Sequence, residues 1–335
     1  MKKLDVVNFL KGFSILTIVL MHYLDRLEGL PNVFYYAIDF GGSGVHSFIF
    51  LSGFGLALSH YNRPINNWLI FYRKRLLKVY IPYSIFVIFI ACFNLFIPLY
   101  KDGLYALLGH LFLYKMFDNS IMTSYGYHLW FISTIIQFYL IFPLAITLTT
   151  RYKIRAFICS VALSLMWSYL VFISDHADER VWNSFFLQYL WVFVLGIYLA
   201  QLYFKDERNF HSIPLLLSIP LGILLSSIYA SMALFGGNYG KIFNDIPAFF
   251  GYNLLALSLY NFNFRFLNQS LIKLNGFSYS LYLIHMFLLS LLIYGLKQIN
   301  LSYNFGWFCV LLFILFPIAF RIQNLTNRFY KIIKL

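Results

Sequence analysis

The stretch LKGFSILTIVLMHY, residues 10–23, is apolar enough to cross a membrane, yet it contains Lys11 and His22. Ionisable side chains inside a span are costly when they face lipid, and they usually face a cavity or a bundle interior. Eleven residue steps make about three helical turns, so both side chains project from nearly one face, roughly 16 Å apart along the axis. A simpler interpretation is that Lys11 reaches the headgroups on one side and His22 lies at the opposite interface.

The whole chain has the composition of a polytopic membrane protein. Of its 335 residues, 61% are hydrophobic and only 11% are charged, whereas about a quarter of the residues in a soluble domain are charged. No small-residue cleavage site follows the first apolar run, so a cleaved signal peptide is not expected. The cysteines lie in separate apolar segments, which predicts neither a disulfide framework nor a metal site. They are Cys92, Cys159 and Cys309.

Apolar segments of about 20 residues, the length that crosses the hydrocarbon core, recur along the chain. We predict an all-α integral membrane protein, a bundle of about ten transmembrane helices that forms one domain over residues 1–335 with no fused soluble domain. The stretch 103–117 is too short to span and is expected to lie at the interface or to re-enter. The predicted spans are 6–24, 41–59, 79–99, 128–148, 155–174, 185–204, 213–235, 246–262, 278–297 and 304–321.

The basic residues predict the orientation of these spans. With ten spans, 19 of the 25 lysines and arginines lie on the side that holds both termini. Cytoplasmic loops are enriched in these residues, so we expect both termini in the cytoplasm. Topology and contact with anionic membrane lipid then explain the net charge of +13. Nucleic acid is not an expected partner, because the basic residues flank spans and form no soluble basic face.

A cationic cluster lies in FYRKRLLKVYIPY, residues 71–83, just before the third predicted span. Its basic residues are Arg73, Lys74, Arg75 and Lys78, of which Arg75 and Lys78 share a helix face. Such a cluster is typical of a segment anchored to lipid headgroups. It also suits a phosphate-rich ligand that arrives from the cytoplasm, because arginine binds phosphate oxygens bidentately.

Three further segments, 48–56, 127–143 and 277–285, carry polar side chains where a lipid-facing span would not. Each segment alone is explained by helix packing, with Gly53 allowing close approach. Together they predict a polar cavity inside the bundle, because polar groups in a membrane require internal partners. The residues expected to line this cavity are Ser52, His128, Gln137, Tyr139, Tyr282 and His285.

Five stretches in this order resemble the type 3 membrane acyltransferases, bacterial proteins of ten helices that modify surface glycans. They are FLKGFSILTIVLMH, FIFLSGF, RKRLLKVYIPY, HLWFISTIIQFYLIFP and FSYSLYLIH, between residue 9 and about residue 287. The resemblance implies a multi-pass protein of the bacterial cytoplasmic membrane. It also implies transfer of an acyl group, acetyl by preference, from cytoplasmic acyl-CoA to a hydroxyl of a polysaccharide or a lipid-linked glycan, without a metal.

The resemblance carries roles onto particular residues. His22 matches the histidine thought essential for acyl transfer, and Lys11 stands where the family more often has arginine. Arg75 and Lys78 match a motif associated with the acyl-CoA donor, with Arg73 beside it, so these residues and Lys11 are the expected donor contacts. Many members carry acidic residues where Ile135 and Ile136 stand, which argues against a catalytic carboxylate there. His22 would act as general base, or it would accept the acyl group itself.

Several residues and functions remain as alternatives. Ser52, Tyr139, Tyr282 and His285 are candidates to orient His22 or to stabilise an oxyanion. No catalytic role is expected for the remaining histidines, which are mostly interfacial or in loops, although His46 and His128 could line the cavity. These histidines are His46, His60, His110, His176 and His211. A glycan exporter or another transporter would also need a polar cavity, and a membrane scaffold would tolerate changes at Lys11 and His22.

Overall fold

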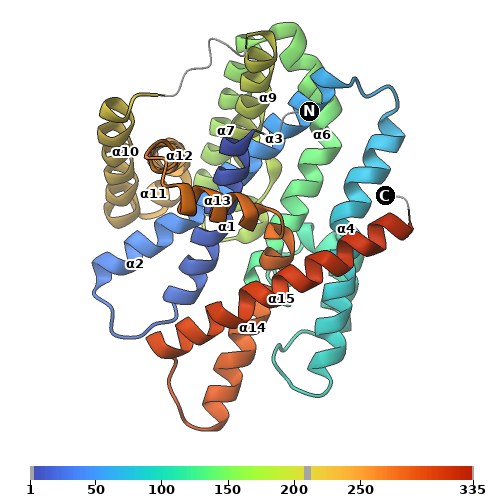
Figure 1. Ribbon diagram of the computed structural model, residues 1–335, viewed down its shortest axis with the longest axis vertical. Helices are drawn as coiled ribbons and strands as arrows, with labels where there is room; N and C mark the ends of the chain where they lie inside the picture. Colours follow the sequence, from blue (N-terminus) through green and yellow to red (C-terminus); the bar gives the residue numbers. More distant parts are fainter. Residues whose placement is uncertain (1–3, 207–212, 334–335) are drawn as a thin grey trace.

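The computed structural model describes residues 4–206 and 213–333, and all regular structure in these ranges is helical (Figure 1). His211 lies outside the described residues. The helices are α1 Asp5–Leu24, α2 Asn32–Asp39, α3 Gly44–Asn62, α4 Trp68–Asn94, α5 Leu104–Leu111, α6 Trp130–Tyr152, α7 Ile154–Ile173, α8 Arg180–Asn183, α9 Leu190–Lys205, α10 Leu215–Phe235, α11 Gly237–Phe243, α12 Asp245–Asn261, α13 Arg265–Asn275, α14 Ser278–Gln298 and α15 Phe305–Ile332. Short 3-10 turns cover Phe40–Ser43, Tyr114–Phe117, Tyr127–Leu129 and Phe186–Tyr189.

Within these ranges, nine helical segments are long and apolar enough to cross a membrane. Helices α11 and α12 make a tenth if this pair, bent by 51°, forms one span. The prediction of an all-α membrane bundle is therefore confirmed. The prediction that both termini are cytoplasmic stays a prediction.

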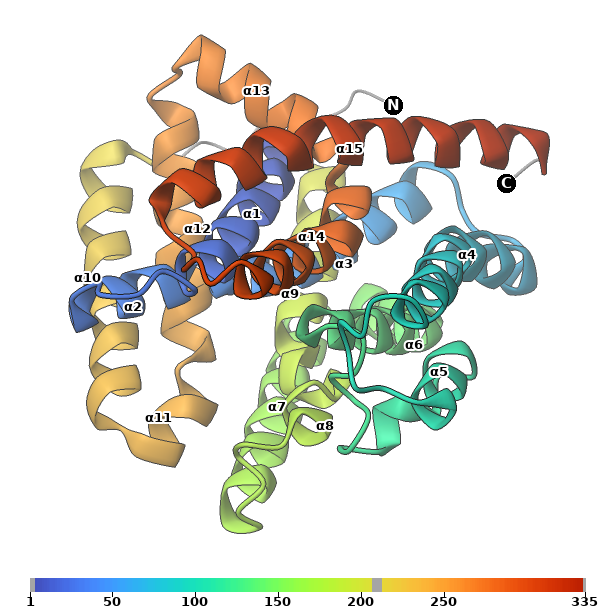
Figure 2. The same ribbon diagram turned by 90° about the horizontal axis from the view of Figure 1, so that it is seen from below.

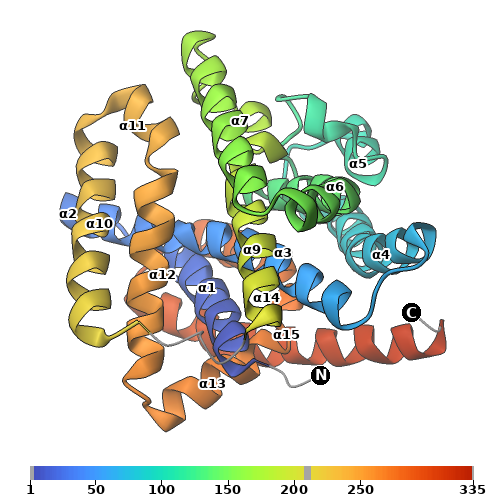
Figure 3. The same ribbon diagram turned by 90° about the horizontal axis from the view of Figure 1, so that it is seen from above.

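The helices form an inner and an outer set. About half of the apolar stretch of α1, α3, α6, α9 and α14 is buried, compared with 11% for α10. Figure 3 shows α1, α3 and α9 in the middle of the bundle with α10 at its edge, and Figure 2 shows α15 running across the outside. The outer helices expose many large apolar side chains, as contact with lipid requires.

Helices α3 and α9 cross in direct backbone contact because each presents a glycine. A Cβ atom on Gly53 would lie 2.3 Å from the carbonyl oxygen of Phe193, and one on Gly196 would lie 2.2 Å from that of Phe50. Neither position has room for any side chain. Small residues at such crossings let helices pack closely inside membranes, and α1 and α6 pack against this central pair.

Several predicted boundaries are wrong. The third span begins at Trp68 and ends at Asn94, so the cationic cluster lies inside α4 and not before it. Asn67 caps this start, because its side chain accepts a hydrogen bond from the Ile70 nitrogen at 3.1 Å. The predicted span 246–262 is one arm of the bent pair, and α15 continues beyond residue 321 to Ile332. The apolar segment of a sequence ends where contact with lipid ends, whereas the helix itself continues beyond that segment in α4 and α15.

The stretch 103–117 forms the short helix α5 and a 3-10 turn, and it is not among the candidate spans. His110, expected at an interface or in a loop, is instead fully buried. Its ring nitrogens lie 2.7 Å from the Tyr83 hydroxyl and 2.8 Å from the Ser124 hydroxyl, and burial lowers the pKa of His110 to about 2. Lys115 is also buried, which lowers its pKa to about 7, and its ammonium donates to the Leu129 carbonyl at 3.0 Å. These contacts hold the chain where it enters α6.

Candidate functional site

Two cavities meet at His22, near the C-terminal end of α1. The wide cavity has a volume of about 850 Å³ and lies beyond that end of the helix, with Asp25 and Arg26 in its wall. The narrow cavity has a volume of about 160 Å³ and extends the other way, between α1, α3, α4, α6 and α14. Four residues line both of them: Ile18, His22, Val45 and Trp130. His22 is the ionisable member of this shared set.

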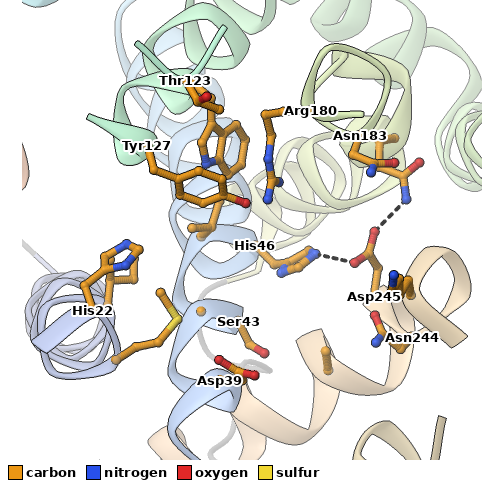
Figure 4. Close-up of a pocket in the computed structure, with 18 of the residues that line it drawn as sticks. His22, Asp39, Ser43, His46, Thr123, Tyr127, Arg180, Asn183, Asn244 and Asp245 are labelled. Carbon is orange, nitrogen blue, oxygen red and sulfur yellow. Dashed lines mark hydrogen bonds and ion pairs between the residues drawn. The ribbon is translucent and has the colours of Figure 1, made fainter. Parts of the chain in front are cut away.

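The wall of the wide cavity opposite His22 holds three side chains in contact, an ion pair between His46 and Asp245 (Figure 4) and a hydrogen bond from Gln188 to Asp245. The Nε2 atom of His46 lies 3.0 Å from Oδ1 of Asp245. The other oxygen, Oδ2, accepts a hydrogen bond from Nε2 of Gln188 at 2.8 Å. The first turn of α3, the start of α12 and the 3-10 turn before α9 supply these residues. His46, expected as a possible lining residue, lies in this wall.

Arg180 enters the same cavity from the start of α8. Its guanidinium stacks on the rings of Tyr127 and Trp130, with the guanidinium carbon 4.8 and 4.9 Å from the ring centroids. Figure 4 shows Arg180 and His46 pointing into the cavity from one side and His22 facing it from another. The positive charges that act on His22 are those of Arg26 and Arg180.

The narrow cavity is mostly apolar. Two of its tyrosines direct their hydroxyls to backbone carbonyls, Tyr279 to Val79 and Tyr282 to His128, both at 2.6 Å. Since both hydroxyls are engaged in this way, these two tyrosines contribute mainly their aromatic rings to the lining of the narrow cavity. Its other lining residues include Ile15, Phe48, Ser52, His128, Phe131, Ile132, Ile135 and Tyr139. Of the candidates from the sequence, this cavity brings Ser52, His128, Tyr139 and Tyr282 together with His22.

Two more histidines stand behind His22. The ring centroids of His22 and His285 are 5.3 Å apart, and those of His285 and His128 are 4.7 Å apart. Nδ1 of the fully buried His285 lies 2.7 Å from the Tyr282 carbonyl. A carbonyl only accepts, so Nδ1 carries the proton and Nε2 presents a lone pair. Among the described residues, nothing hydrogen-bonds to that buried Nε2.

The predicted donor contacts separate into two groups. Arg75 lines a third cavity of about 360 Å³ between α3 and α4, together with Lys74 and Asn67. The charge of Arg75 also acts on Lys11 and on Tyr139, which lines the narrow cavity. Arg73 and Lys78 are exposed, whereas Lys11 is half-buried. None of these three residues lines any of the three cavities.

Contrary to expectation, His285 lines none of these cavities, and neither does Gln137. Its Oε1 accepts a hydrogen bond from the Phe186 nitrogen at 3.0 Å, and its amide nitrogen lies 3.8 Å from the Met116 sulfur. The side chain ties α6 to the turn before α9. Sequence reasoning did not single out Arg180 or Asp245. For Arg180 there was a signal, because it is one of only six basic residues on the side predicted to be extracytoplasmic.

Comparison with known proteins bears on this arrangement. No similar protein was found among curated proteins, and none among solved structures. Residues 4–322 match the sequence model of the acyltransferase 3 family, which is described as an acyltransferase domain. The match spans all the residues that line the wide and narrow cavities. Because it covers nearly the whole chain, the protein belongs to the acyltransferase 3 family.

Proposed function

We propose that the protein is a membrane O-acyltransferase that moves an acyl group, acetyl by preference, from cytoplasmic acyl-CoA to a hydroxyl of a cell-surface or exported polysaccharide or of a lipid-linked glycan. It acts in the bacterial cytoplasmic membrane with both termini in the cytoplasm. The observation that carries the proposal is that His22 lines both cavities. A residue in that position contacts two substrates that approach from opposite sides of the membrane.

The donor occupies the narrow cavity. Arg75 and Lys74 beside the third cavity, with Lys11 nearby, bind the phosphates of the nucleotide. The pantetheine arm extends along the mostly apolar lining, so that the thioester lies next to His22. Ser52 and Tyr139 line the narrow cavity, and their hydroxyls are the donors that we assign to the thioester carbonyl oxygen.

The acceptor occupies the wide cavity, whose polar lining suits a sugar chain. The neutral imidazole of His22 takes the proton of a sugar hydroxyl while the oxygen attacks the carbonyl carbon of the thioester. A tetrahedral intermediate forms, and its carbon–sulfur bond then breaks. The imidazolium of His22 gives its proton to the departing CoA thiolate. The products are an ester and free CoA.

His285 is a positioning residue for His22 in this mechanism. Its Nδ1 donates a hydrogen bond to the Tyr282 carbonyl, so its Nε2 carries a lone pair. This Nε2 is buried and accepts no hydrogen bond from any described residue. The ring centroids of His22 and His285 are 5.3 Å apart, and a rotation of the His22 ring during catalysis would let it donate a hydrogen bond to that nitrogen. The second nitrogen of His22 would then keep its lone pair toward the substrate. A base oriented by a third group is the usual arrangement around an activated hydroxyl.

The test is to express the wild type, His22→Ala and His60→Ala at equal membrane levels and to measure acyl groups on surface glycans by mass spectrometry. General base catalysis is worth about 10²- to 10⁴-fold, so His22→Ala should abolish detectable acylation. His60 lines neither the wide nor the narrow cavity, and its variant should acylate normally. Equal acylation in all three would refute the proposal, and glycan export that persists without His22 while acylation never occurs would favour a transporter.

A further inference from the structure

Arg180 is held rigidly in the wall of the wide cavity. Its guanidinium lies over two aromatic faces, Tyr127 and Trp130, on the same side of the cavity. Arginine stacks well on aromatic rings because its charge is delocalised over a flat group. Two such contacts hold the guanidinium against the cavity wall.

The N–H groups of this guanidinium have no partner within the described part of the chain. Arg180 forms no side-chain hydrogen bond there and takes part in none of its ion pairs. The charge of Asp245 acts on Arg180, but the two oxygens of Asp245 are engaged by His46 and Gln188. The other carboxylates of the cavity, Asp25, Asp39 and Asp178, are exposed.

The surroundings indicate what Arg180 binds. The guanidinium edge matches the planar, bidentate geometry of a carboxylate or a phosphate, which neutral hydroxyls do not match. It lines the wide cavity and not the narrow one. Its ligand therefore belongs to the acceptor and not to the thioester. Its charge also acts on His22, so an anion bound there lies in the same space as the reacting hydroxyl.

We propose that Arg180 is an anion-binding subsite for the acceptor, which is therefore a glycan that carries an acidic group close to the hydroxyl that is acylated. The acidic group is the carboxylate of a uronic acid or the phosphate of a phosphorylated sugar. This inference rests on the proposed function for the identity of the wide cavity as the acceptor site. It adds the chemical class of acceptor that the cavity selects.

The experiment measures binding without acyl-CoA, using the full-length protein in lipid nanodiscs and calorimetric titration. Three probes are compared: a tetrasaccharide of alternating glucuronate and N-acetylglucosamine, a neutral tetrasaccharide of N-acetylglucosamine, and N-acetylglucosamine 1-phosphate. The proteins are the wild type, Arg180→Gln, Arg180→Lys and Arg26→Gln. Arg26 lines the same cavity but is exposed, so its variant controls for the loss of one positive charge.

The wild type should bind the glucuronate probe, the phosphate probe or both about 10- to 100-fold more tightly than the neutral tetrasaccharide, the range of a bidentate charged contact. Whichever acidic probe binds tightly identifies the source of the anion. Arg180→Gln should abolish the preference while neutral binding stays within about twofold, and Arg26→Gln should keep most of it. Arg180→Lys keeps the positive charge but loses the planar guanidinium that makes two parallel hydrogen bonds, so it should keep part of the preference.

The inference fails if the wild type shows no preference, if Arg180→Gln retains it, or if Arg26→Gln loses as much. If Arg180→Gln does not fold, the test rests on Arg180→Lys. An undiminished preference of Arg180→Lys for the acidic probes would also overturn the bidentate site. Failure of the proposed function looks different. In that case the acidic preference and its dependence on Arg180 persist in these titrations, while His22→Ala leaves surface acylation unchanged.

Discussion

The wide and narrow cavities share His22 but differ in size and lining. The wide cavity, about 850 Å³, is walled by charged and amide side chains such as Arg180 and Asp245, whereas the narrow one, about 160 Å³, is walled mainly by aliphatic and aromatic groups. A hydrated sugar chain suits the first, and the thin arm of an acyl carrier suits the second. One bundle thus offers a polar and an apolar compartment, and the catalytic candidate stands at their boundary.

The largest effect should come from Gly53→Leu, which breaks both compartments together. Helix α3 supplies His46 to the wide cavity and Ser52 to the narrow one, and no Cβ fits at Gly53 against the Phe193 carbonyl. The α3–α9 crossing should open, with loss of folded protein in size-exclusion chromatography from detergent. Gly55→Leu is the control, because a Cβ at Gly55 meets nothing within 4 Å. Equal loss in both variants would contradict the role of the crossing.

Filling only the narrow cavity should separate the two compartments. Ser52→Phe adds a ring to a space of about 160 Å³, so acyl transfer should fall by at least about 100-fold while glycan binding in the wide cavity is retained. Ser52→Ala should lose about tenfold or less, the value of one hydrogen bond to the thioester. Measured acyl transfer by Ser52→Phe near the wild-type rate would show that the donor lies elsewhere.

The boundary is probed at His285. His285→Leu removes the lone pair behind His22 and should lower kcat about 10- to 100-fold with an unchanged KM for acyl-CoA, because the residue touches neither substrate. His285→Gln places an oxygen near the position of Nε2 and should recover part of kcat. Steady-state kinetics in nanodiscs give both constants. No recovery in the glutamine variant, with equal thermal stability of both, would argue for simple packing.

The smallest effect should appear at the mouth of the donor path. Arg75 lines a cavity and acts on Lys11 and Tyr139, whereas Lys78 is exposed and lines no cavity described above. Arg75→Gln should raise the KM for acetyl-CoA about tenfold, the value of a charge-assisted contact. Lys78→Gln should raise it about twofold or less. An identical response of both variants would return the cluster to a role in lipid anchoring.

Local features of the sequence predicted much of the bundle. The apolar spans and the polar residues on three of them follow from segment length and from the cost of polar groups in lipid, whereas the pairing of Lys11 with His22 stays a prediction. The beginning of α4 did not follow, because charged residues end a hydrophobic run without ending a helix. The His46–Asp245 contact could not be predicted either, since 199 positions separate the two residues and only tertiary packing brings them together.

The narrow cavity has a consequence for the membrane as an electrical barrier. Two open compartments on either side of one histidine would let ions leak, and the aliphatic and aromatic wall around Ile135 and Phe48 opposes this because ions enter an apolar space only at high cost. Under the proposed function, side chains there keep the membrane insulating as well as admit the donor, so a polar substitution at Ile135 should first cause an ion leak.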